Sequence, residues 1–245
     1  MFVFLALVFG VGFVVFGVGS SLPSGVADIL GNKSSSGATS VDDALKAVQK
    51  NPKDAKAQFE LSQAYQRDGK LDAAIPPLAK YVELKPKDTN GLSQLAGLYT
   101  TQASRAQEEA AAAQQQYQEA AGIGAFQSSG TSNIFQAGAL DKLILDDAQK
   151  HLQDASTKSR EAFGNAASAY GKLTKLTPKD AEIWYLMGIS AEQASDYATA
   201  LKGYKRFVKL SPDAPEAQLV RQRIKSLEQS SQQPTATNGA ATTTG

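Results

Sequence analysis

Between residues 40 and 229, apolar side chains recur every third or fourth position, the spacing of helices with one buried face. No stretch shows the strict alternation of a half-buried strand, so the pattern predicts an all-α fold. The first helix is expected to begin at Ser40, with Asp43 three residues later in a helix-start signature, and to end before Pro52.

An internal repeat is the most informative pattern of the chain. Residues 55–88 and 181–214 are both 34 residues long and align without a gap. Each holds two apolar stripes at helical spacing, which predict a pair of helices, and a proline that ends the second one. Small residues occupy the expected helix crossings, namely Ser62 and Ala74 in one copy and Gly188 and Ala200 in the other.

A third copy lies between these two and is split by an insertion. Residues 89–100 supply its first helix and residues 166–180 its second, so this unit spans 89–180. The residues that define the three copies are Leu61, Tyr65, Ala74, Pro86, Tyr99, Ala166, Tyr170, Pro178, Trp184, Gly188, Ala200, Tyr204 and Pro212.

These copies resemble the tetratricopeptide repeat family over about residues 41–229. The resemblance implies a helical-repeat solenoid that binds proteins or peptides in a concave groove lined by the first helix of each pair. The lining positions that it implies are Lys56, Phe59, Gln63, Gln66, Arg67, Glu182, Tyr185, Ile189, Glu192 and Gln193. Some members clamp a C-terminal carboxylate. Gln63 and Ile189 stand where that clamp has asparagine, so this activity is not expected here.

The insertion, at about 103–160, predicts a long antiparallel helical hairpin. Its first arm is made of strong helix formers and should continue to about Ala121, and its second should start near Ala139. We expect the alanine-rich first arm to pack against the leucine-rich second arm. Four apolar residues are expected in the turn, where they either plug the open end or contact a partner or a bilayer: Ile123, Phe126, Ile134 and Phe135.

Two further expectations concern helix ends. Pro76 and Pro77 fall inside the second helix of the first repeat, which should therefore start late or kink. Residues 215–229 resemble the capping helix with which such stacks end, and residues 230–245 are expected to be a disordered tail.

The segment 2–19 contains only apolar residues and glycine, and as a helix it would be about 27 Å long. It is expected to be a transmembrane helix within residues 1–19, followed by a flexible linker at 20–39. An uncleaved anchor is favoured over a signal peptide cleaved after the small pair Gly25 and Ala27. The missing basic flank suggests that the natural start lies upstream. By analogy with exported, anchored repeat proteins, we expect the repeat domain outside the cytoplasm.

Composition narrows the function. The net charge is +1, there is no cysteine, and His151 is the only histidine and is expected to be solvated. No catalytic motif is found, and basic and acidic residues balance along the folded part without a basic stripe. We therefore expect no enzyme, no cofactor, no metal and no nucleic acid. The predicted function is a membrane-anchored adaptor. The alternatives are a holdase for exported chains and a structural homo-oligomer joined through the hairpin.

Overall fold

The computed structural model describes residues 39–127 and 137–232. The chain divides into two units, 1–38 and 39–245, and only the second contains described residues. The side chains of residues 120–127, 137–141 and 231–232 are not part of the description. Within the described ranges every regular element is an α-helix, as the hydrophobic pattern predicts.

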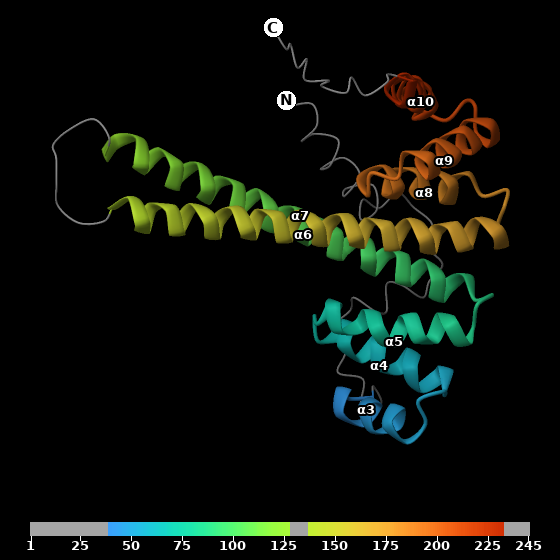
Figure 1. Ribbon diagram of the computed structural model, residues 1–245. Coiled ribbons are helices and arrows are strands. Elements are labelled where there is room, and N and C mark those ends of the chain that lie inside the picture. The colour runs from blue at the N-terminus through green and yellow to red at the C-terminus, as the bar shows by residue number, and fades with distance from the viewer. Residues whose placement is uncertain (1–38, 128–136, 233–245) are drawn as a thin grey trace, which may run out of the picture. The chain divides into compact units, whose positions relative to one another are not determined.

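Successive helices pack against one another in chain order, and two of them project from the stack as a hairpin (Figure 1). The helices are α3 (Val41–Lys50), α4 (Ala55–Arg67), α5 (Leu71–Leu84), α6 (Thr89–Gln127), α7 (Ala137–Leu176), α8 (Ala181–Gln193), α9 (Tyr197–Leu210) and α10 (Ala217–Gln232). The pairs α4–α5, α6–α7 and α8–α9 are the three predicted repeats, and α10 follows at the C-terminal end.

The first helices of the repeats begin in the same way, because an aspartate precedes each of them. Asp54 accepts hydrogen bonds from the backbone N–H groups of Lys56 and Ala57 at 2.9 and 3.3 Å. Asp180 does the same for α8 at 3.1 and 3.3 Å, and Asp88 accepts from Asn90 at 3.0 Å. These carboxylates satisfy N–H groups that have no partner inside the helix.

Helix α3 corresponds to the second helix of a further, incomplete repeat. The residues after it, Asn51-Pro52-Lys53-Asp54, match Lys85-Pro86-Lys87-Asp88 and Thr177-Pro178-Lys179-Asp180. Ser40 caps it through the backbone N–H of Asp43 at 3.2 Å, as the sequence indicates. Ala44 is fully buried against α4, so the stack begins with this half-unit.

The main core lies between the first and second repeats. Leu78, Leu92 and Leu173 are fully buried there, on α5, α6 and α7. The hydroxyl of Ser62 is also buried and donates to the carbonyl oxygen of Ala74 at 2.8 Å. The small pair predicted at this crossing is therefore in contact, and a buried polar group is satisfied.

The last repeat has a close helix crossing. A Cβ atom added to Gly188 would lie 2.6 Å from the Tyr204 ring. One added to Gly203 would lie 2.7 Å from the backbone oxygen of Trp184. Gly188 was expected at a crossing from the repeat pattern, and Gly203 is the residue that faces it from α9.

Three expectations about the helices need correction. Helix α5 begins at Leu71 despite Pro76 and Pro77, so it does not start late, and a kink at these prolines stays a prediction. It begins at the same repeat position as α9. The packing of buried Leu78 and Val82 outweighs the backbone cost of the prolines. Helix α6 continues to Gln127, beyond Ala121, so Ile123 and Phe126 belong to a helix rather than to the turn. A glycine costs a helix only about 1 kcal/mol, less than is needed to end this run.

The packing inside the hairpin also differs from expectation. The buried residues of its α7 arm are small, among them Ala148, Ala155 and Ala162, while Leu143 and Ile144 are 65% and 48% exposed. Alanine thus faces alanine at these positions, while Leu143 and Ile144 lie on an exposed side of α7.

Within residues 39–127 and 137–232, no helix is both long enough and apolar enough to span a bilayer. The predicted membrane segment and most of the linker, as well as residues 233–245, lie outside the described residues. The last helix of the stack, expected at 215–229, is observed at Ala217–Gln232.

Candidate protein-binding surface

The first helix of the first repeat, α4, carries five of the ten proposed groove residues. Lys56 and Arg67 are exposed at its two ends. The guanidinium of Arg67 donates to the carbonyl oxygen of Thr39 at 2.7 Å, and Gln66 donates to the Ser62 hydroxyl at 3.1 Å. Phe59 packs on the core with its ring centroid 4.8 Å from that of Tyr81, and Gln63 is half-buried beside it on the helix.

The other five residues lie on α8, in the last repeat. The Tyr185 ring lies 4.8 Å from Phe207 and 6.4 Å from Tyr204, so its face is held by α9. Ile189 packs in the same cluster. Glu182 is exposed, and Gln193 accepts a hydrogen bond at 3.3 Å from Gln107 on the hairpin. Tyr185, Ile189 and Gln193 of the predicted groove therefore contact other helices of the same chain.

Glu192 is held by a network rather than left free in the groove. Its carboxylate accepts from the Tyr204 hydroxyl at 2.8 Å and from Nε of Arg223 at 2.7 Å, with a further ion pair to the Arg223 guanidinium. Burial, followed by the Glu192 carboxylate, raises the pKa of Tyr204 well above its usual value. The hydrogen bond to Glu192 raises the pKa of Arg223. The network fastens α10 to α8 and α9.

The middle repeat contributes a set of first-helix residues that the sequence interpretation did not include. They occupy the same repeat positions as the residues above and are Asn90, Ser93, Gly97, Thr100 and Thr101 on α6. Ser93 and Gly97 are exposed, and a Cβ atom on Gly97 would meet nothing within 4 Å. The repeat register is the signal that could have found them.

Exposed Ser93 and Gly97 of α6 belong to the repeat between the two predicted groups. Helix α4 packs against α3 and α5, whereas α8 packs against α7 and α9. Between them in the repeat order stands the first helix of the middle repeat. Its small side chains leave the backbone around Gly97 accessible to a ligand chain.

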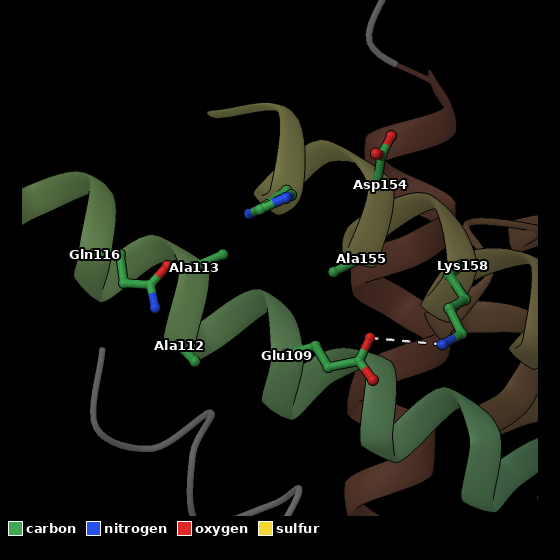
Figure 2. A pocket seen from close by; sticks show the side chains of 8 residues that line it. Glu109, Ala112, Ala113, Gln116, Asp154, Ala155 and Lys158 are labelled. Carbon is green, nitrogen blue, oxygen red and sulfur yellow. Dashed lines mark ion pairs between the residues drawn. The ribbon is translucent and has the colours of Figure 1, made fainter. Parts of the chain in front are cut away.

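Figure 2 shows a cavity of about 400 Å³ between the hairpin arms that the sequence did not predict. Its lining residues are Glu109, Ala112, Ala113, Gln116, His151, Asp154, Ala155 and Lys158. Lys158 and Glu109 form an ion pair of 3.5 Å across one end, and exposed His151 lies 3.7 Å from Asp147. The facing alanines leave this space, because their side chains are too short to fill it.

The proposed hairpin-tip contact falls largely outside the described residues. Ile134 and Phe135 lie in the segment 128–136, and Ile123 and Phe126 are described by their backbone alone. Among the described residues, no group of acidic or histidine side chains is arranged to hold a metal ion.

The family model of the tetratricopeptide repeat matches residues 31–89 and 158–215. The chain accordingly contains tetratricopeptide repeats in these two regions. The first match spans α3 to α5, and the second spans the inner part of α7 together with α8 and α9. The hairpin arms between them are the part that departs from the family pattern.

Among solved structures, the chain is similar to MamA, with 16% identity over 70% of this chain and 86% of that one, at a TM-score of 0.23. It is also similar to YrrB, a tetratricopeptide-repeat protein with an unusual peptide-binding site. That match has 14% identity over 75% of this chain and all (100%) of that one, at a TM-score of 0.23. No curated protein matches the chain.

Proposed function

We propose that this protein is a membrane-anchored scaffold that binds a peptide segment of another protein along α4, α6 and α8. The family of these repeats consists of protein-interaction modules that are generally non-catalytic. The observation that carries the proposal is the row of exposed polar residues and open backbone on these first helices, with Gly97 at its centre.

Charge indicates what the bound segment looks like. Arg67 gives the α4 end of the surface an exposed positive charge, while Lys56 is paired with Glu60 at 3.7 Å and Glu182 is exposed at the α8 end. The charge of Glu192 is balanced by Arg223. We therefore propose a ligand with acidic side chains over α4, small or polar ones over Gly97, and a basic or aromatic one beside Glu182 and Tyr185.

Site-specific photocrosslinking tests this surface. A photoreactive amino acid replaces exposed Ser93 on α6 or, as the matched control, exposed Lys150 on the hairpin. Adducts from position 93 and none from position 150 are expected, and Gly97→Arg should then abolish the adduct. Adducts from position 150 alone would reject the groove and favour binding through the hairpin.

Anchoring through residues 2–19 is the second part of the proposal, with the repeat domain outside the cytoplasm. The uniformly apolar stretch supports it, since its length suits the hydrocarbon thickness of a bilayer. Alkaline extraction of membranes should leave the chain in the pellet, and protease added to spheroplasts should digest the repeats. Release into the supernatant would reject the anchor, and digestion only after lysis would reject the orientation.

A structural oligomer is the second candidate, and the exposure of Leu143 and Ile144 on α7 favours it. Two such faces could pack together and bury these side chains. Sedimentation of the full chain in detergent should then show a dimer that Leu143→Ser with Ile144→Ser dissociates. A chain that stays monomeric at all concentrations removes this candidate.

A further inference from the structure

The four loops that lead from a second helix into the next first helix lie along one edge of the stack. In Figure 1 this edge is on the side away from the hairpin. Contacts agree with the picture. Phe59 near the start of α4 touches Tyr81 near the end of α5, and Arg206 near the end of α9 donates to the carbonyl oxygen of Pro178 at 3.4 Å.

Exposed lysines gather at this edge, although they are far apart in the sequence. We call it the lysine edge, and its members are Lys50, Lys53, Lys85, Lys87, Lys175, Lys179 and Lys209. The balanced charge of the chain indicated no basic stripe. That expectation concerned charge along the sequence, whereas the repeat brings the same loop position of each unit to the same side.

The acidic side chains in the same loops are fewer than the lysines and are Asp54, Asp88, Asp180, Asp213 and Glu216. None of its seven lysines forms an ion pair within the described residues, whereas Lys46, Lys70 and Lys80 elsewhere do. Three of the four aspartates in these loops, Asp54, Asp88 and Asp180, are directed at helix starts. The hydrogen bond from Tyr81, together with the backbone N–H groups, keeps the pKa of Asp88 below its usual value.

Apolar side chains accompany these lysines. Leu176, 37% exposed, ends α7 between Lys175 and Lys179, and Leu219, 49% exposed, lies in the first turn of α10. Both therefore lie at the edge where the second helices end and the first helices begin. Exposed leucine among unpaired lysines suits the boundary between lipid headgroups and acyl chains.

We propose that the lysine edge docks on an anionic bilayer, with the lysines at lipid phosphates and Leu176 and Leu219 in the headgroup layer. This goes beyond the proposed scaffold function, because it assigns a membrane-facing surface independent of residues 2–19. It also orients the domain, with the hairpin directed away from the bilayer. Each lysine near an anionic surface strengthens docking about fivefold.

The chain has no cysteine, so single-cysteine variants allow clean labelling. Gln218→Cys places an environment-sensitive fluorophore at the edge, beside Leu219. Ala198→Cys places it at the start of α9, on the opposite edge; both positions are exposed. The labelled full-length protein is reconstituted with vesicles of phosphatidylcholine alone or of phosphatidylcholine with phosphatidylglycerol.

We expect a blue shift at position 218 on anionic vesicles only, reversed by high salt, and none at position 198. The triple variant K175Q/K179Q/K209Q should weaken docking about a hundredfold, whereas K70Q/K142Q/K150Q, with the same change of charge, should not. Equal emission on the two kinds of vesicle, an equal shift at position 198, or equal effects of the two triple variants would overturn the proposal.

The same samples separate this proposal from the anchor. A chain that resists alkaline extraction from neutral vesicles but shows no shift at position 218 retains the anchor and rejects the docking edge. A chain that alkaline extraction releases from neutral vesicles, but whose label at position 218 shows a blue shift on anionic vesicles, rejects the anchor and retains the docking edge.

Discussion

At the scale of single residues, the glycines of this chain differ sharply in what surrounds them. Gly203→Ala would place a methyl group 2.7 Å from the backbone oxygen of Trp184, and the backbone cannot yield without separating α8 from α9. We expect a loss of about 1–3 kcal/mol in unfolding free energy, measured by urea denaturation.

Gly97→Ala is the matched control, because the same change meets nothing within 4 Å in the middle of helix α6. It should raise the unfolding free energy by about 0.5–1 kcal/mol through helix propensity. If both variants were destabilised equally, close packing at Gly203 would not be the cause.

Buried tyrosines predict the alkaline limit of stability. Burial, then the Glu192 carboxylate, raises the pKa of Tyr204, so the folded chain keeps this proton while the unfolded chain loses it near pH 10. Stability is therefore present below pH 10 and is lost as the pH rises further. Tyr204→Phe should reduce the slope of unfolding free energy against pH by about 1.4 kcal/mol per unit. A slope equal to that of the wild type, in urea titrations, would contradict this.

Contacts between single residues could be predicted where the repeat pattern specifies which positions lie at a helix crossing. The spacing indicated that Gly188 lies at a crossing, and Tyr204 fills it. The bond between Glu192 and Arg223 could not be predicted, because the two residues are 31 apart and lie on helices whose relative rotation the pattern does not specify.

Among the elements, α5 is one continuous helix despite two prolines. Pro76 is exposed and removes a backbone hydrogen bond from the helix, whereas Pro77 is buried in the packing. Pro76→Ala should restore that bond and raise the unfolding free energy by about 1–3 kcal/mol. Pro86→Ala, in the loop after α5, serves as the control and should lower it by about 0.5–1 kcal/mol. An unchanged or lower stability of Pro76→Ala in urea denaturation would show that the missing bond costs nothing.

The hairpin was predictable as two arms but not in its packing. The run of helix-forming residues extends α6 past its expected end. Facing alanines also leave a cavity, which the spacing of apolar residues does not predict. At the base of the hairpin, buried Ala103, Ala162 and Phe163 pack with Ala194.

A deletion of residues 110–156 with a short connecting turn should therefore leave a stack that unfolds in one cooperative transition. A deletion of 103–160 should fold less stably, since it removes Ala103 from the cluster at the base of the hairpin. Circular dichroism during urea unfolding distinguishes them. Equal midpoints for the two deletions would mean that this cluster contributes no stability.

For the whole molecule, a repeat found in the sequence predicts the order of the helices. It also predicts which residues of different repeats come together at one edge of the stack. The repeat placed the helix pairs correctly, whereas the balance of charge along the sequence does not specify how the lysines of four loops are arranged in space. Composition averages over the chain, whereas a stack brings equivalent positions such as Lys85, Lys87 and Lys179 to one edge. The charge distribution on the surface can therefore be predicted only when the repeat alignment is extended to the polar positions.

Two ion pairs hold the last helix of the stack, which packs against α9. Lys205 on α9 pairs with Glu228 on α10, and Arg223 on α10 pairs with Glu192 on α8, whose side chain is only 15% exposed. In stacks of this kind each unit is stabilised by its neighbours, so weakening one of these contacts should loosen the end and leave the rest intact.

Arg223→Ala removes the ion pair to Glu192 and leaves the Glu192 carboxylate with the Tyr204 hydroxyl alone. We expect a loss of about 1–2 kcal/mol and faster amide exchange in α10, with unchanged exchange in α4 and α5. Arg221→Ala, on the same helix but exposed and bonded only to the carbonyl oxygen of Pro212, should change exchange little. Uniformly faster exchange in all helices would mean that the stack unfolds as one unit, and that the cap sets the stability of the whole binding surface.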